Sequence, residues 1–166
     1  MRTRLISVVG SGNEPPQAVA GLAERLGAEL VAAGYGIVTG GRGGVQEAVC
    51  RGAVKARGKA SEPPLVGLLP GYDARAGNAY LDLSIPTGLS QAHHALVASA
   101  GEVMVCIGGA TGAMAEVALA RKMGRPVVAL VPSGGTAGLL ARAMDSVYAA
   151  ETTEAVIARI AQLLPE

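Results

Sequence analysis

The chain has 166 residues, half of them hydrophobic, and its 14 basic and 13 acidic side chains give a formal net charge of +1. That balance argues against a surface built for nucleic acid or for an anionic membrane, so we expect neither as a partner. The length suits one domain, which we place at residues 1–166.

Hydrophobic periodicity predicts strands that alternate with helices along the chain. Strands are expected at residues 5–9, 35–39, 65–69, 81–85, 103–107, 126–131 and, briefly, 146–148. Helices are expected at residues 17–33, 45–56, 89–100 and 113–122, near Leu139, and through 156–164 with Thr153 as the N-cap. Such alternation predicts a three-layer, Rossmann-like α/β fold: a mainly parallel sheet of six or seven strands with helices on both faces.

The two cysteines and the N-terminal residues indicate the cellular compartment. Cys50 and Cys106 do not form a CxxC pair, which favours reduced thiols packed in the core. No signal peptide is recognisable, and no apolar run approaches the roughly 18 residues of a membrane span. We therefore expect a cytoplasmic protein.

Three glycine clusters follow predicted strands, and ligands of parallel α/β sheets bind beyond the carboxyl ends of the strands. We therefore expect the clusters to meet in one site. The first cluster, Gly10, Ser11 and Gly12, lacks the third glycine of a dinucleotide fingerprint. It suits a smaller nucleotide or a phosphate, with an ordinary strand-to-helix turn as the alternative.

The second cluster places four glycines around one arginine: Gly40, Gly41, Arg42, Gly43 and Gly44. Backbone N–H groups in such a turn can face an anion, and Arg42 would add a charge-assisted contact. A flexible turn with a solvated arginine is the alternative. The cluster is not a P-loop, because no Gly-Lys-Ser/Thr follows.

The third cluster precedes a helix and contains Gly108, Gly109, Thr111 and Gly112. Free N–H groups at a helix start, together with the helix dipole, favour a phosphate. Thr111 either caps the helix or donates its hydroxyl to that anion. Glu116, one turn later, is either a carboxylate favoured by the dipole or a site residue that bonds a ribose hydroxyl or acts as an acid or base.

His93 and His94 lie near the start of the helix predicted at residues 89–100. Adjacent helical side chains point about 100° apart, so we expect at most one of them to face the site, and the sequence does not say which. The pair lacks the spacing of a metal site, so none is predicted. Two interpretations stay open: one histidine contacts an anionic ligand, or the histidines are ordinary surface or core residues.

In order along the chain, these segments resemble the LOG-like Rossmann proteins of the SLOG superfamily, once labelled "possible lysine decarboxylase". The likeness extends to the compact branch that includes molybdenum-cofactor-carrier-type proteins. It spans nearly the whole chain, in the stretches "VVGSG", "GYGIVTGGRGGVQEAVCRGA", "VGLLPGYD", "NAYLDLSIPTGLSQAHHALVASAGEVMVCIGG" and "MAEVALARKMGRPVVAL".

The resemblance implies a phosphate-binding PGGxGTxxE motif, whose glutamate acts with an arginine on the N-glycosidic bond of a nucleoside monophosphate. The motif's glycines and glutamate match at Gly108, Gly109, Gly112 and Glu116, with one residue more between the second and third glycines than the motif has. Its proline is replaced by Ile107 and its threonine by Ala113. The family's arginine corresponds to His93, and His94 stands where the compact branch commonly has asparagine. A histidine lacks the permanent charge and planar fork of arginine, so the catalytic pair is incomplete.

We therefore expect a carrier or sensor of a phosphorylated ligand, either a nucleotide or the molybdenum cofactor, with no certain resident cofactor. The alternative is a nucleoside 5′-monophosphate phosphoribohydrolase with Glu116 and His93 catalytic. Single-stranded DNA binding is disfavoured by the near-zero charge and scarce aromatic residues. Alanine-rich helices at residues 89–100 and 113–122 favour a homodimer or higher homo-oligomer, by analogy with the family.

Overall fold

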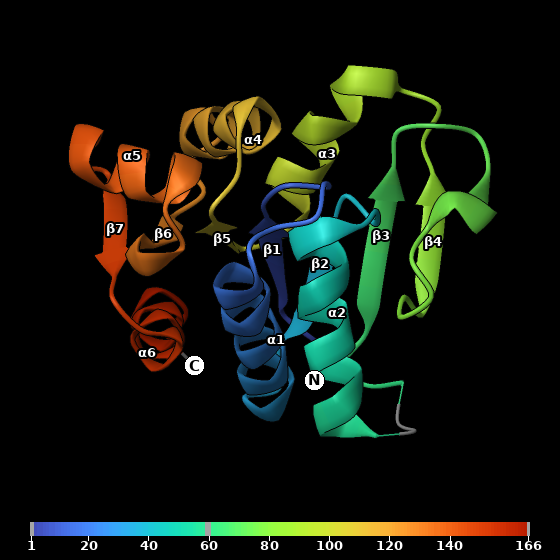
Figure 1. The fold of residues 1–166 in the computed structure, drawn as a ribbon, viewed down its shortest axis with the longest axis horizontal. Coiled ribbons are helices and arrows are strands. Elements are labelled where there is room, and N and C mark those ends of the chain that lie inside the picture. Colours follow the sequence, from blue (N-terminus) through green and yellow to red (C-terminus); the bar gives the residue numbers. More distant parts are fainter. Residues whose placement is uncertain (1, 59–60, 166) are drawn as a thin grey trace.

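The structure is a computed structural model that describes residues 2–58 and 61–165. Its seven strands form one parallel sheet in the order β4-β3-β2-β1-β5-β6-β7 (Figure 1). The strands are β1 (Leu5–Val9), β2 (Gly36–Thr39), β3 (Leu65–Leu69), β4 (Leu83–Pro86), β5 (Val103–Ile107), β6 (Val127–Leu130) and β7 (Val147–Ala150). The predicted α/β sheet is confirmed, and it is wholly parallel.

Six α-helices cover the two faces of the sheet (Figure 1). They are α1 (Gln17–Ala32), α2 (Gly44–Arg57), α3 (His93–Ala100), α4 (Thr111–Lys122), α5 (Gly135–Ala143) and α6 (Thr153–Leu163). One core cluster joins α1, α2 and α6 to the sheet, and a second joins α3, α4 and α5 to the opposite face. Among the described residues, no helix is both long and apolar enough to cross a membrane.

The side chains of β1 alternate between the two faces of the sheet, so this short strand contributes to both core clusters. Ile6 and Val8 belong to the first core cluster, whereas Val9 belongs to the second. Ser7 points to the same side as Val9, and its buried hydroxyl donates to Val97 O at 2.6 Å and accepts from Gly101 N at 2.9 Å. Successive side chains of a strand point to opposite faces, so a strand that is buried on both faces is mostly apolar. The one polar side chain of β1, Ser7, is buried with hydrogen-bond partners.

Helices α1 and α2 cross at two glycines. A Cβ atom on Gly27 would stand 1.9 Å from Val49 O, and one on Gly52 would stand 1.9 Å from Glu24 O. Backbone therefore meets backbone without intervening side chains. At the end of this contact, Arg51 and Lys55 both bond the Glu24 carboxylate at 2.8 Å.

The structure corrects three local predictions. Strand β4 begins at Leu83 rather than at residue 81, because the amide of Leu81 still bonds Asn78 O within the preceding turn. The N-cap of α6 is Thr152, whose hydroxyl accepts from Ala155 N at 3.1 Å, whereas Thr153 Oγ1 donates to Glu29 Oε1 at 2.9 Å. The helix predicted at residues 89–100 is divided into a 3₁₀ turn, η2 (Ser90–Ala92), followed by α3.

Candidate functional site

A cavity of about 460 Å³ lies at the carboxyl ends of β1, β2 and β5. The chain leaves β1 toward β2 on one side and later returns to pair with β1 from the other side through β5. Such a reversal of strand order opens the crevice in which α/β proteins bind ligands. The cavity is lined by Gly10, Ser11, Gly12, Asn13, Arg42, Gln46, Pro70, Gln91, His93, His94, Ala110, Thr111, Gly112, Ala113 and Glu116.

The start of α4 forms one wall of the cavity. Its N-cap is Ala110, and no described side chain caps the helix. The amides of Thr111, Gly112 and Ala113 have no hydrogen-bond partner among the described residues, and the first helical bond runs from Met114 N to Ala110 O. Uncapped N–H groups and the positive end of the helix dipole make this wall suitable for an anion.

The facing wall consists of the loops after β1 and β2, which Gln46 holds together. Its Oε1 accepts from Arg42 N at 2.9 Å, and its Nε2 donates to Gly10 O at 3.3 Å. The amide of Val45 also donates to Ser11 O at 2.9 Å. The first two glycine clusters thus lie against each other, as their positions after neighbouring strands predict.

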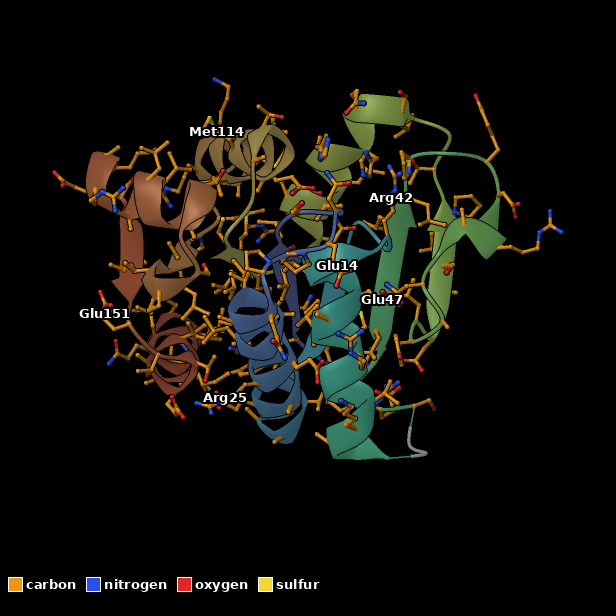
Figure 2. The ribbon with its side chains drawn as sticks, viewed as in Figure 1. Glu14, Arg25, Arg42, Glu47, Met114 and Glu151 are labelled. Carbon is orange, nitrogen blue, oxygen red and sulfur yellow. The ribbon has the colours of Figure 1, made fainter. Side chains whose placement is uncertain are left out.

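Arg42 supplies a positive charge at the opening of the cavity. Its side chain is exposed, belongs to the loop that leads into α2 (Figure 2), and forms no ion pair with the part of the chain that the structure describes. A guanidinium in this position can make a charge-assisted bond to a phosphate or carboxylate in the cavity.

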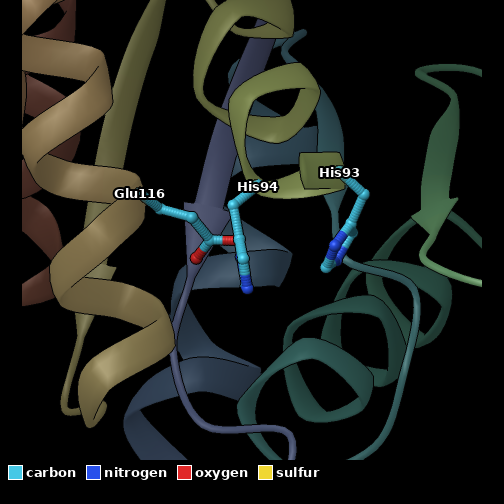
Figure 3. A group of neighbouring side chains, drawn as sticks. All are labelled: His93, His94 and Glu116. Atoms are coloured by element: carbon cyan, nitrogen blue, oxygen red, sulfur yellow. The ribbon is translucent and has the colours of Figure 1, made fainter. Parts of the chain in front are cut away.

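Glu116 and His94 form a hydrogen-bonded pair that links α4 to α3 (Figure 3). The distance from His94 Nδ1 to Glu116 Oε1 is 2.8 Å, and the Glu116 residue is only 4% exposed. Burial raises the pKa of the Glu116 carboxyl above its ordinary value, and the hydrogen bond from His94 opposes that rise. The carboxylate is therefore held by histidine at the position where sequence matching placed the family's glutamate.

His93 lies beside His94 at the first turn of α3 (Figure 3), and both line the cavity. Their ring centroids are 4.4 Å apart. Burial lowers the pKa of His93 below its usual value, with a smaller effect in the same direction from the charges of His94 and Arg42, while the bond to Ser90 O opposes it. The prediction that at most one histidine faces the site is wrong, because the rings converge although their Cβ atoms diverge. It is His94, and not His93, that contacts Glu116.

The cavity brings together most of the predicted site residues, but six glycines do not line it: Gly40, Gly41, Gly43, Gly44, Gly108 and Gly109. The amide of Gly108 donates to Ser133 Oγ at 2.7 Å, and that of Gly41 to Thr39 Oγ1 at 2.9 Å, so neither is free for an anion. A Cβ on Gly44 would stand 2.3 Å from Ser11 O. Close packing of loops at these glycines explains their presence, whereas Gly112 and its neighbours line the cavity.

Sequence reasoning missed six residues that line the cavity: Asn13, Gln46, Pro70, Gln91, Ala110 and Ala113. Gln46 and Gln91 are polar side chains within a turn of predicted glycine or histidine motifs, a signal that could have identified them. Pro70 follows β3, and only the observed strand order shows that the end of this strand reaches the site.

The chain matches the model of the SLOG cluster4 family over residues 3–161. It is 30% identical over 132 residues to a protein of Archaeoglobus fulgidus, covering 80% of this chain and 83% of that one. The molybdenum cofactor binding protein of Rippkaea orientalis has a similar structure, with a TM-score of 0.86, 30% identity and 98% coverage of both chains. The molybdenum cofactor carrier protein of Chlamydomonas reinhardtii gives a TM-score of 0.85 and 31% identity, covering 99% of this chain and 100% of that one.

Proposed function

The chain belongs to the SLOG cluster4 family, and we propose that it binds a phosphorylated, nucleotide-like or pterin-like small molecule as a carrier or sensor. One observation carries the proposal: two groups line the same cavity, the first turn of α4, which no described side chain caps, and Arg42, which forms no ion pair with a described residue. Together they provide backbone donors, a helix dipole and a full positive charge for one anionic group.

The molybdenum cofactor is a candidate ligand beside the nucleoside monophosphates. Its pterin bears a phosphate, which fits the anion-binding wall, and the solved relatives from Rippkaea orientalis and Chlamydomonas reinhardtii are named for binding or carrying this cofactor. In this chain it would be cargo, held by its phosphate at the start of α4.

Calorimetric titration with AMP, GMP and a phosphorylated pterin, in a buffer containing chelator, tests the proposal. At least one ligand should bind and raise the melting temperature, because it stabilises the folded state by mass action. Arg42→Ala should weaken that binding about tenfold or more, since it removes a charged hydrogen-bond donor. Arg25→Ala, which removes an exposed arginine at the opposite end of the molecule, is the matched control (Figure 2). Failure of all three ligands, or an Arg42→Ala variant with unchanged affinity, would contradict the proposal.

Hydrolysis of a nucleoside monophosphate is the second candidate function. The observation that favours it is the Glu116 carboxylate, which lines the cavity and is bonded to His94 at 2.8 Å. A carboxylate with a raised pKa beside a histidine can act as an acid or base. Release of free adenine from AMP that disappears in Glu116→Gln would establish this function in place of simple binding.

Self-association forms the remaining part of the proposal. Exposed apolar side chains lie in or next to η2, α3 and α4; they are Leu89, Leu96, Met114 and Met123. We call the solvent-exposed surface of α3 and α4 the α3–α4 face. Helices α3 and α4 pack against each other, so one partner can contact both helices. We propose that residues 1–166 act as one domain that forms a homo-oligomer through this face.

A further inference from the structure

The two histidines of the chain share one cavity with a carboxylate. His93, His94 and Glu116 each offer one potential ligand atom, and these atoms all lie within 4.8 Å of one another (Figure 3). The imidazole rings are tilted by 41°, with centroids 4.4 Å apart. The cavity therefore holds two imidazoles and one carboxylate, side chains of the kind that bind transition metals, within reach of one ion.

In both histidines the Nδ1 atom already has an oxygen partner. His93 Nδ1 lies 2.8 Å from Ser90 O, and His94 Nδ1 lies 2.8 Å from Glu116 Oε1. An oxygen acceptor at Nδ1 holds the proton there and leaves the lone pair on Nε2. Histidines that bind metals almost always donate their other N–H to a carbonyl or carboxylate in this way. Both orienting partners are therefore present.

Ser90 adds independent support from the backbone. Its φ is 50°, the only positive value among the described non-glycine residues. A serine in the left-handed region of backbone conformation is energetically unfavourable, and such residues cluster at functional sites. In this conformation its carbonyl oxygen accepts from the His93 ring, so the unfavourable backbone coincides with the contact that orients a proposed ligand.

We propose that His93 and His94 bind a divalent transition-metal ion of the zinc class through their Nε2 atoms, with Glu116 as a positioning residue. Imidazole suits Zn²⁺, Cu²⁺, Ni²⁺ and Co²⁺. Gln91 Oε1 lies 3.3 Å from His94 Nε2. With the lone pair on Nε2, the Gln91 amide must turn so that its NH₂ group faces the ring, and a metal ion would displace it. Two protein ligands leave coordination positions open to the cavity. The inference rests on the proposed function in one respect: a phosphate oxygen of the bound ligand would fill one of those positions.

The charges near the site predict how metal and anion influence each other. Arg42 opposes a bare cation, although its exposed position allows the solvent to screen the repulsion. Glu116 contributes one negative charge from the other side. An anion that neutralises Arg42 should therefore strengthen metal binding, and the metal should strengthen anion binding by the same factor.

Titration of tag-free protein with Co²⁺ alone, followed by visible absorption, tests the metal site without any nucleotide. The wild type should bind one Co²⁺ per chain, and His93→Gln and His94→Gln should each weaken binding about tenfold or more. Electron paramagnetic resonance with Cu²⁺ should detect two imidazole nitrogens in the wild type and one in each variant. Arg42→Ala is the matched control: it should keep or strengthen Co²⁺ binding while losing affinity for AMP.

Circular dichroism and melting temperature identify variants that fail to fold, and Glu116→Gln provides a further measurement on a chain with both histidines. That variant should bind Co²⁺ roughly 10–100-fold more weakly, the usual effect of losing an orienting partner. No bound Co²⁺ in the wild type, or equal binding by a folded variant that combines His93→Gln with His94→Gln, would overturn the metal site. AMP binding is measured in the presence of chelator and therefore does not depend on the metal. A failed metal site can thus be told apart from a failed proposal of anion binding.

Discussion

His94 Nδ1 and Glu116 Oε1 lie 2.8 Å apart, so that one charge-assisted hydrogen bond joins α3 to α4 beside the cavity. The side chains are 19% and 6% exposed, respectively. His94→Ala should lower the free energy of unfolding by about 1–3 kcal/mol, because it leaves a buried carboxylate without a partner. A double-mutant cycle with Glu116→Ala, followed by urea unfolding, should give a coupling energy of roughly 0.5–3 kcal/mol. Strictly additive effects would show that the pair contributes no mutual stabilisation.

His93 should make stability depend on pH. Burial lowers its folded-state pKa below the usual 6.5, so the unfolded chain takes up this proton first as the pH falls. The stabilisation is fully present above about pH 6.5 and is lost below it. The difference in free energy of unfolding between wild type and His93→Gln should therefore shrink between about pH 7.5 and pH 5. Both proteins retain Glu116, His94 and Arg42, and parallel pH curves would count against the buried neutral state of His93.

Gly52 should resist substitution because α2 touches α1 there. A methyl group would meet Glu24 O at 1.9 Å, so Gly52→Ala forces the helices apart and should cost about 1–3 kcal/mol or more. Gly21→Ala is the matched control in α1, since nothing lies within 4 Å of its Cβ position. That change should stabilise the protein by roughly 0.5–1 kcal/mol. Thermal unfolding of both variants measures the contrast, and equal melting temperatures would refute the tight crossing.

Gly112 should separate binding from stability. A Cβ atom there would contact His94 Cε1 at 3.4 Å, which is tolerable, and the residue has no positive φ. Gly112→Ala should leave the free energy of unfolding within about 1 kcal/mol of wild type. The methyl group would nevertheless occupy the cavity beside the free amides of α4, so AMP affinity should fall. Calorimetry and thermal unfolding of one preparation give both values; unchanged affinity would place the anion elsewhere.

The α3–α4 face should hold copies of the chain together. Met114 is 39% exposed on this face, so Met114→Glu places a charge where a partner would bury it. Light scattering coupled to size exclusion should give an oligomer for wild type and a smaller species for the variant. Leu139→Glu is the control, because Leu139 is similarly exposed but lies on α5. A monomeric wild type would contradict the proposed self-association.

Most of the fold is predictable because it follows from short apolar runs. Strands β1, β3 and β5 lie at the predicted residues, since nearly every side chain in them is buried and apolar. Prediction was less accurate at the edge of the sheet, where Leu83 and Ile85 of β4 are exposed and a turn extends through Leu81. There the boundary depends on hydrogen bonds that periodicity does not encode.

The sequence predicts where the cavity lies better than it predicts the hydrogen bonds that its residues form. Strand ends and glycine clusters indicated where Gly10, Arg42 and Thr111 would meet. Glycine in such a turn can expose its amide to a ligand or let two loops pack, and the sequence is identical in both cases. Gly108 shows the second outcome, because Ser133, which is 25 positions away, takes its amide. The pairing of Glu116 with His94 likewise depends on how α3 and α4 pack.

Gln46 determines which parts of the cavity wall move together. Because its one amide group bonds both Gly10 O and Arg42 N, the loops after β1 and β2 are tied into a single piece. The corresponding tie on the other wall is the His94–Glu116 bond between α3 and α4. We expect the width of the cavity to change by movement of these two pieces against each other, so that a ligand touching Arg42 and the start of α4 at once would act as a spacer between them.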